Sequence, residues 1–274
     1  MTINCKGELI DLSQPKVMGI LNITPDSFFE GSRTQTQDDI LRRAEKLVTE
    51  GATFIDIGGY SSRPNAEDVA EAEENKRVIF ATEILLKEFP DILISIDTFR
   101  SSVAANALNT GAALINDIAA GNLDENMMHV IAKYQVPYIM MHMRGTPQNM
   151  NQLTDYKNLV TDINFYFSEK IKEARGLGIN DLILDPGFGF SKTIAQNFEL
   201  LKNVDLFNIF DLPLLIGISR KNMIYKTLNN TPAEALNGTT ILNTLALTKG
   251  ASILRVHDVK EAVECVKLYS EVIK

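Results

Sequence analysis

Eight short apolar runs alternate with longer segments of helical spacing, and this alternation restricts the fold more than any other feature of the sequence. Each run is nearly continuous, which is typical of parallel strands buried on both faces. The runs occupy residues 17–21, 54–57, 92–96, 114–115, 138–141, 182–184, 214–218 and 253–256. The helical segments occupy residues 37–50, 66–88, 103–109, 125–134, 156–177 and 259–273. We therefore predict an α/β fold in which helices cover a parallel sheet.

The number of runs and the length of the chain together favour one architecture. Strand–helix units that repeat eight times in 274 residues fit a (β/α)8 TIM barrel, which typically needs about 250 residues. We expect a single domain over residues 1–274. The first 16 residues precede the first strand, and we expect a short hairpin-like extension there, across the bottom of the barrel.

Composition excludes several classes of protein. The chain is 45% hydrophobic and 23% charged, an ordinary globular composition that excludes intrinsic disorder. Its net charge of −8 argues against broad nucleic-acid binding. No apolar stretch approaches the roughly 20 residues of a transmembrane helix, and no secretory signal is visible. Cys5 and Cys265 cannot form a disulfide framework, so we expect a cytoplasmic protein that binds small molecules, with no nucleic acid and no membrane.

Polar side chains follow the apolar runs, at the strand ends where a barrel of this kind carries its active site. In chain order they are Asn22, Arg63, Asp97, Asn116, His142, Asp185, Lys221, Arg255 and His257. Because the carboxyl ends of the strands share one rim, we expect most of these groups to meet there. A purely structural barrel would not need them. We interpret His142 as a structural histidine that hydrogen-bonds backbone.

Asp97 and Asp185 each follow an apolar strand directly and therefore start in a poorly solvated place. Either one could simply cap a helix or pair with a neighbouring cation. With Asn116 and Lys221 on the same rim, the two carboxylates could instead recognise a heterocycle with adjacent N–H donors, such as a 2-aminopyrimidinone edge.

Arg63, Arg255 and His257 form a second group, and Asn22 joins it from the first strand. Arginine offers a fork of donors that suits phosphate oxygens, so this group predicts a diphosphate site. The alternative is that Arg255 pairs with Asp258. No His/Cys cluster is present, which argues against zinc. Asn22 together with diphosphate oxygens would suit Mg²⁺, which prefers oxygen ligands.

The sequence resembles the dihydropteroate synthase family of folate biosynthesis. The matching segments are MGILNITPDSF at 18–28, GATFIDIGGYSSRP at 51–64, IDTFR at 96–100, INDI at 115–118, MHMRGTPQNM at 141–150, LILDPGFGF at 182–190, GISRK at 217–221 and RVHDV at 255–259. They span nearly the whole chain in order. The resemblance implies a TIM-barrel transferase that condenses 6-hydroxymethyl-7,8-dihydropterin diphosphate with p-aminobenzoate, giving dihydropteroate and diphosphate.

The resemblance also implies a role for each site residue. Those implied for the pterin are Asp97, Asn116, Asp185, Lys221 and Arg255. Those implied for the diphosphate are Asn22, Arg63, Arg255 and His257, with Mg²⁺ on Asn22. Those implied for p-aminobenzoate, where sulfonamides would compete, are Phe28, Ser62, Pro64, Phe190, Lys221 and Asn222. The catalytic set is Asp97, Asp185, Lys221, Arg255 and His257.

Five positions depart from the pattern expected of that family. They are Glu30, Tyr60, Ser62, Arg100 and Asn222, where Asp, Glu, Thr, Lys and Ser are common. Asn222 opens a helix whose N-terminus would receive the p-aminobenzoate carboxylate. Its amide can still cap and donate, so we expect activity with an altered p-aminobenzoate affinity.

Three other functions fit part of the pattern. A pterin-binding methyltransferase barrel would share the Asp and Asn contacts but would not need Arg63 or His257. A degenerate homologue would bind pterin without turnover, although every assigned catalytic position is filled. An aldolase-type barrel could use Lys221 as a Schiff base, but it leaves the two carboxylates unexplained. The resemblance implies a homodimer, and the apolar segment 234–249 could supply its interface or simply pack against the barrel.

Overall fold

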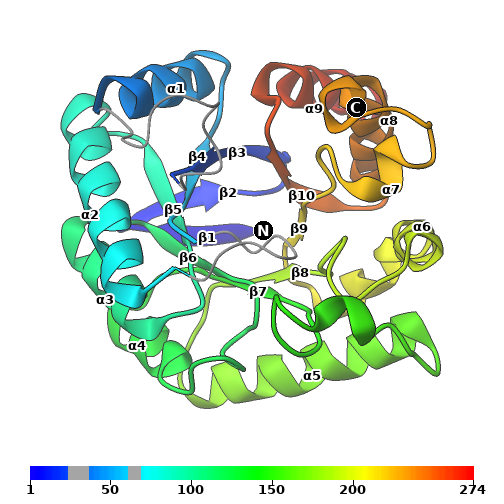
Figure 1. The fold of residues 1–274 in the computed structure, drawn as a ribbon, viewed down its shortest axis with the longest axis horizontal. Coiled ribbons are helices and arrows are strands. Elements are labelled where there is room, and N and C mark those ends of the chain that lie inside the picture. Colours follow the sequence, from blue (N-terminus) through cyan, green and yellow to red (C-terminus); the bar gives the residue numbers. More distant parts are fainter. Residues whose placement is uncertain (24–36, 61–68) are drawn as a thin grey trace.

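The computed structural model describes residues 1–23, 37–60 and 69–274. Within them, parallel strands close into one barrel in the order β10-β3-β4-β5-β6-β7-β8-β9 (Figure 1). The barrel strands are β3 (Lys16–Asn22), β4 (Phe54–Gly58), β5 (Leu93–Asp97), β6 (Leu114–Asp117), β7 (Tyr138–Met141), β8 (Leu182–Asp185), β9 (Leu214–Ile216) and β10 (Ala251–Val256). Each matches one of the predicted runs, so the barrel prediction is confirmed.

Helices surround the barrel, as Figure 1 shows. They are α1 (Gln37–Thr49), α2 (Glu71–Glu88), α3 (Ser101–Thr110), α4 (Met127–Tyr134), α5 (Leu159–Gly176), α6 (Ile194–Lys202), α7 (Asn222–Tyr225), α8 (Leu236–Thr248) and α9 (Val259–Val272). Short 3-10 turns are η2 (Met150–Gln152), η3 (Val204–Phe210) and η4 (Pro232–Glu234). The predicted segment 66–88 was too long, because helix α2 begins at residue 71; residues 66–68 of that segment lie outside the described residues.

Helix α6 was not predicted from hydrophobic spacing, and its signal lies at its start. The Thr193 hydroxyl accepts from the backbone N–H of Gln196, and the Gln196 side chain accepts from the backbone N–H of Thr193. This reciprocal pair is a capping box, which satisfies N–H groups that the first turn leaves without helical partners. The start of this nine-residue helix is therefore marked by its cap, which hydrophobic spacing does not reveal.

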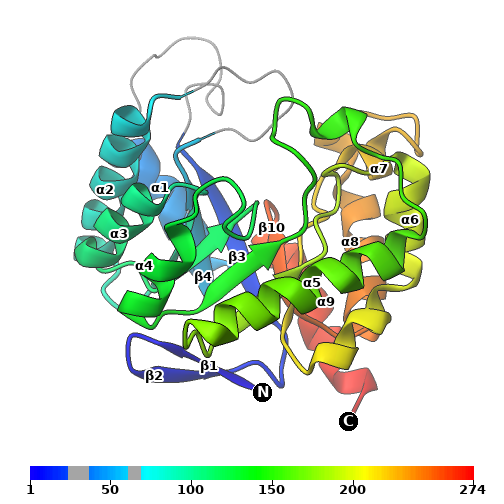
Figure 2. The same ribbon diagram turned by 90° about the horizontal axis from the view of Figure 1, so that it is seen from below.

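The predicted N-terminal hairpin is present, and it lies across the end of the barrel opposite the carboxyl ends of the strands (Figure 2). Its strands β1 (Thr2–Cys5) and β2 (Glu8–Asp11) pair antiparallel. Lys6 and Gly7, with φ of 56° and 88°, form the two-residue turn, which needs positive φ at both positions. Ile3 and Cys5 pack into the barrel bottom against Phe54, so the hairpin seals that end.

The inside of the barrel changes from apolar to polar along its axis. Near the bottom, buried apolar side chains fill it, namely Phe54, Leu93, Leu114, Ile139, Ile183, Leu215 and Ile253. Because side chains alternate along a strand, the residues two positions later face the same interior. These are Asp56, Ser95, Asn116, Met141, Asp185, Gly217 and Arg255. The alternation that places apolar side chains at the bottom of the barrel therefore also directs carboxylates, an amide and a guanidinium into its upper part.

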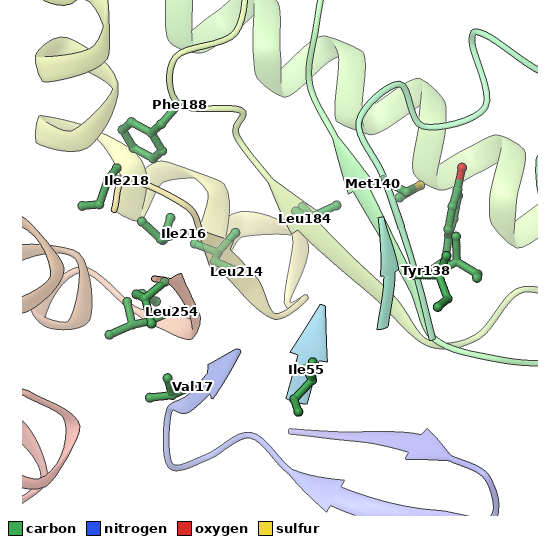
Figure 3. Close-up of a cluster of buried hydrophobic side chains, with 14 of the residues drawn as sticks. Val17, Ile55, Tyr138, Met140, Leu184, Phe188, Leu214, Ile216, Ile218 and Leu254 are labelled. Atoms are coloured by element: carbon green, nitrogen blue, oxygen red, sulfur yellow. The ribbon is translucent and has the colours of Figure 1, made fainter. Parts of the chain in front are cut away.

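The strand residues that alternate with these interior positions face outward and form the core between barrel and helices. Figure 3 shows part of this cluster, in which Ile55, Met140 and Leu254 belong to three different strands. Burial of a side chain of this size contributes about 1.5–3 kcal/mol. The layer supplies a stable frame for the rim. No helix in the described part of the chain is long and apolar enough to cross a membrane.

Candidate active site at the barrel rim

Arg255 connects two carboxylates inside the upper barrel. Its Nε donates to Oδ2 of Asp56 at 2.6 Å, and its Nη2 donates to Oδ2 of Asp97 at 2.7 Å. Charge-assisted bonds of this kind are roughly twice as strong as neutral ones. The two carboxylates hold the pKa of Arg255 above its usual range against the effect of burial, so the guanidinium stays charged. The arrangement fixes a planar cation across the barrel.

Asn116 joins this network from β6. Its Nδ2 donates to the same Oδ2 of Asp56, at 3.0 Å. Asp56 is completely buried, and its Oδ1 has no hydrogen-bond donor among the described residues. Asp56 is not among the site residues predicted from sequence, because it lies within an apolar run rather than after one. A signal was available, since Asp56 is two residues after the inward-facing Phe54.

Asp97 and Asp185 behave as carboxylates in a poorly solvated place. Burial raises the pKa of Asp97 to about 7, and the negative charge of Asp56 adds to this, while Arg255 opposes it. Burial also raises the pKa of Asp185, against the nearby charge of Lys221. Asp97 does pair with a cation, as one alternative proposed, but the structure places that cation within the site. Asp185 accepts from the backbone N–H of Gly187 at 2.8 Å.

The alternative that Arg255 pairs with Asp258 is wrong. Asp258 instead binds Arg220 through two hydrogen bonds of 2.8 Å each, from Nε and Nη2. Arg220 was not predicted as this partner, and the geometry of the strand ends explains the pairing. Arg255 faces the barrel interior, whereas Arg220 sits in the turn after β9 with a φ of 54°. Arg255 is thereby left available for the rim.

Lys221 reaches the rim from the segment after β9. Its ammonium donates to the carbonyl of Phe188 and lies 4.7 Å from the centroid of the Phe190 ring. Burial lowers the pKa of Lys221 to about 8, although the neighbouring Asp185 opposes the shift. Gly189, with a φ of 80°, lets the loop approach this side chain closely. Phe190 and Lys221, both predicted for one pocket, are therefore in contact.

A buried lysine that the sequence analysis did not select supports the same loop. Lys192 donates to the carbonyls of Gly187 and Phe190, each at 2.9 Å, and lies 3.1 Å from Nδ1 of His142. Burial lowers the pKa values of Lys192 and His142 well below their usual ranges. Lys192 was missed because it lies seven residues beyond the strand end. Lys192 thus holds the loop of residues 187–190, which includes Phe188, the residue whose carbonyl accepts from Lys221.

The predicted phosphate-side residues are described only in part. His257 is exposed at the end of β10, with its Nδ1 3.0 Å from the Ser219 hydroxyl. Asn22 ends β3, and its Oδ1 lies 3.0 Å from the position that a Cβ would take at Gly58. Asp97 Oδ2 lies 3.9 Å from that same position. The other residues of the prediction lie outside the described residues, and they are Phe28, Glu30, Ser62, Arg63 and Pro64.

An apolar cluster lies on the same side of the barrel and was not predicted. Its buried members are Ile118, Ala119, Met141, Met143 and Met150, and Phe99, Leu123 and Phe190 pack against it. Met141 faces the barrel interior directly above Ile139 on β7. Flat ligand sites combine such apolar walls with a few polar groups. The rim thus offers an apolar wall beside the carboxylate network.

Two of the departures from the expected family pattern meet beside β5. The Arg100 guanidinium lies 5.3 Å from the centroid of the Tyr60 ring and binds the buried Glu74 at 2.6 Å. Gln148 donates to the Tyr60 hydroxyl at 3.0 Å. This cluster joins the segments that follow three strands. Asn222 is the first residue of α7, as predicted, with Lys221 as its N-cap.

Comparison with known proteins gives a consistent result. Residues 18–257 match the family described as pterin binding enzyme. Dihydropteroate synthase of Escherichia coli K12 is 40% identical over 270 residues, covering 98% of this chain and 95% of the relative. That of Bacillus subtilis is 40% identical over 254 residues, covering 92% and 86%.

Solved structures agree. A Yersinia pestis dihydropteroate synthase in a sulfonamide drug complex superposes with a TM-score of 0.93 at 41% identity, covering 100% of this chain and 99% of that one. A Xanthomonas albilineans dihydropteroate synthase with 4-aminobenzoic acid has a TM-score of 0.92 at 34% identity, covering 99% and 98%.

Proposed function

This chain belongs to the pterin-binding enzyme family, among the dihydropteroate synthases. From that premise we propose which residues of the barrel rim bind each substrate. The chain is a transferase of folate biosynthesis, which condenses 6-hydroxymethyl-7,8-dihydropterin diphosphate with p-aminobenzoate to give dihydropteroate and diphosphate. The observation that carries the assignment of residues is the largely buried network of Arg255, Asp97 and Asn116, with Asp185 and Lys221 on the same rim.

The pterin binds to that network. Asp97 and Asp185 are acceptors in a poorly solvated place, and they suit the adjacent N–H donors of the 2-aminopyrimidinone edge. Asn116 adds an amide that can accept as well as donate. Lys221 is a donor that suits the ring carbonyl. Arg255 presents a planar guanidinium for stacking on the ring, which a lysine could not replace.

The diphosphate binds beside the pterin, toward Asn22 and His257, and Arg63 completes this group. Mg²⁺ would be held by Asn22 and by substrate oxygens. The donor set fits, because the Asn22 and Asp97 oxygens flank Gly58, and oxygen is the ligand that Mg²⁺ prefers. Among the described residues no cluster of three His, Cys, Asp or Glu side chains could hold a metal by itself. Bound there, Mg²⁺ would neutralise charge on the diphosphate.

The reaction needs charge stabilisation more than a strong base. Departure of diphosphate develops negative charge on its oxygens, which Arg255 and His257 stabilise from the rim. Departure also leaves positive charge on the pterin methylene, which the Asp97 carboxylate offsets. The amine of p-aminobenzoate is already nucleophilic when neutral. It would attack from a pocket formed by Phe190, Lys221 and Asn222 together with Phe28, Ser62 and Pro64, where a sulfonamide would compete.

A diphosphate-release assay with omissions tests the function. Purified protein is given the dihydropterin diphosphate, p-aminobenzoate and Mg²⁺, and each component is left out in turn. We expect release that requires all three, with dihydropteroate as the product. Pterin binding without turnover would instead favour a degenerate homologue or a pterin-binding methyltransferase. Turnover that persists after chelation would remove Mg²⁺ from the account.

We also propose that the protein is a cytoplasmic homodimer. Helices α8 and α9 pack side by side, and they expose the apolar side chains of Ile241, Leu245, Leu268 and Val272. Large apolar side chains exposed on two neighbouring helices are the kind of surface that an interface covers. Both cysteines are free and buried, which suits a reducing compartment. Sedimentation of the parent and of Ile241→Glu tests the dimer, and a parent that sediments as a monomer would contradict it.

A further inference from the structure

Asp56 is the buried carboxylate at the centre of the rim network, and the proposed chemistry gives it no task. It is completely buried on β4, above Phe54. One of its oxygens, Oδ2, accepts from both Arg255 Nε and Asn116 Nδ2. An ionised carboxylate in such a place costs several kcal/mol unless it is paired. An apolar side chain could fill this space at lower cost, so the presence of a carboxylate here calls for another explanation.

Asp56 determines which way the Asn116 amide faces. A carboxylate can only accept, so the Asn116 NH₂ group must point toward Asp56. The amide oxygen is then directed away from Asp56 and is presented as an acceptor. An Asn that could rotate freely would present either group. Asp56 thus converts an ambiguous amide into one acceptor of fixed direction.

Asp56 also determines where the Arg255 guanidinium lies. The bond to Nε holds the inner part of the side chain, and Asp97 holds the outer part through Nη2. With two carboxylates at different points along it, the planar group cannot swing or rotate easily. Under the proposed function this plane stacks on the pterin. Without Asp56, the Arg255 side chain would lose its Nε bond and keep, of its hydrogen bonds to described residues, the one from Nη2 to Asp97.

The neighbouring Asp117 shows what a purely structural carboxylate looks like in this barrel. It is also completely buried, but both of its oxygens are satisfied. Oδ2 accepts from the Tyr138 hydroxyl at 2.6 Å and from the Gly121 N–H at 2.7 Å, and Oδ1 accepts from the Ala119 N–H at 2.8 Å. Asp56 Oδ1 has no such donor among the described residues. Nearly all buried polar atoms are paired in native proteins. Asp56 Oδ1 therefore has the capacity to accept one further hydrogen bond.

We propose that Asp56 is a positioning residue for pterin binding, which acts through Asn116 and Arg255 and not on the reacting atoms. The inference rests on the proposed function, because it assumes that these two side chains contact the pterin. It predicts that the loss of the Asp56 charge weakens pterin binding without affecting p-aminobenzoate. A carboxylate that only stabilised the fold would change neither affinity in the folded protein.

The first test is Asp56→Asn, which keeps the size of the side chain and removes its charge. Binding of 6-hydroxymethylpterin is measured by calorimetry, and the KM of each substrate is measured in the release assay. We expect the pterin Kd to rise about tenfold or more, as for the loss of a hydrogen bond to a charged group. The KM of p-aminobenzoate should stay within about twofold. Asp117→Asn is the matched control, and its folded fraction should bind pterin as the parent does.

A double-mutant cycle separates positioning from an independent contact. Asp56→Asn and Asn116→Ala are measured for pterin binding singly and together. Because Asp56 acts through Asn116, we expect the double variant to lose less affinity than the product of the two single losses. Losses that multiply would overturn the positioning role. So would an Asp56→Asn protein that binds pterin as tightly as the parent.

Failure of the Asp56 proposal can be distinguished from failure of the proposed function. A parent that binds pterin but makes no dihydropteroate would refute the synthase assignment. The role of Asp56 would then still be decided by the calorimetric comparison. A parent that does not bind pterin at all would refute both.

Discussion

Replacing Arg255 by lysine should weaken the enzyme through geometry alone, since the positive charge is kept. The guanidinium bonds Asp56 from Nε and Asp97 from Nη2, at 2.6 and 2.7 Å. These two nitrogens lie at different points along the side chain, and lysine has a single nitrogen at its end. A lysine extended toward Asp97 therefore cannot also bond Asp56, and among the described residues Asp56 then has a single hydrogen bond, from Asn116.

The expected loss follows from one missing charge-assisted hydrogen bond. Such bonds contribute about 1.5–3 kcal/mol, and the Arg255 side chain is only 18% exposed, so solvent screens them little. At about 1.4 kcal/mol for each factor of ten, kcat/KM for the dihydropterin diphosphate should fall roughly tenfold to 140-fold. The lost stacking surface adds to this fall, because an ammonium has no planar face.

The assay is steady-state kinetics with both substrates varied. The KM of p-aminobenzoate should change little, because Arg255 is assigned to the pterin and the diphosphate. Arg175→Lys is the matched control, since Arg175 donates to the carbonyls of Ile179 and Asn180 before β8, at the other end of the barrel. If Arg255→Lys kept kcat/KM within about twofold of the parent, the reasoning from the network would be refuted.

Three further predictions concern the loop, the charges and the helix start. Gly187→Ala should destabilise the protein and abolish pterin binding, because Gly187 has a φ of 74° and a Cβ there would overlap the His142 carbonyl oxygen. Thermal melting measures the loss of stability, and calorimetry measures the loss of binding. Affinity for 6-hydroxymethylpterin, followed by calorimetry, should rise as pH increases through about 7, where Asp97 ionises. It should fall above about 8, where Lys221 loses its proton. Asn222→Ser should change the KM of p-aminobenzoate in the release assay.

Each of these predictions has a control and an outcome that contradicts it. Gly176→Ala, in helix α5 with open space around its Cβ, should leave binding intact, and equal behaviour of the two glycine variants would contradict the loop argument. Asp97→Asn should abolish the rise of affinity near pH 7; an unchanged pH profile would remove Asp97 from the pterin site. An unchanged p-aminobenzoate KM would mean that the Asn222 side chain does not reach that ligand.

The barrel could be predicted from sequence because its strands are short, continuous and buried on both sides. A strand buried on both sides must be apolar along its whole length, so the positions of all eight strands could be predicted. Helix boundaries were less certain, since helix α2 is shorter than its periodic segment and α6 depends on a capping box rather than on a stripe. Local hydrogen bonds, not hydrophobic spacing, determine where such helices begin.

Most of the described site could be predicted for a similar reason. Asp97 and Asp185 end strands and Asn116 is the last residue but one of β6, and the carboxyl ends of the strands share one rim. Asp56 was missed because its carboxylate lies inside a run that reads as core, and only the alternation of side chains reveals that it faces the interior. Lys192 was missed because a buried lysine in a loop depends on tertiary contacts with carbonyls that the sequence does not show.

A crystal structure with 6-hydroxymethylpterin and diphosphate would test the central claim most directly. We predict that the aminopyrimidinone edge of the pterin lies within hydrogen-bonding distance of Asp97, Asn116 and Asp185, with Arg255 against the face of the ring. The diphosphate should lie toward Asn22 and His257. A pterin bound elsewhere, or bound at the rim without contact to these carboxylates, would contradict the account.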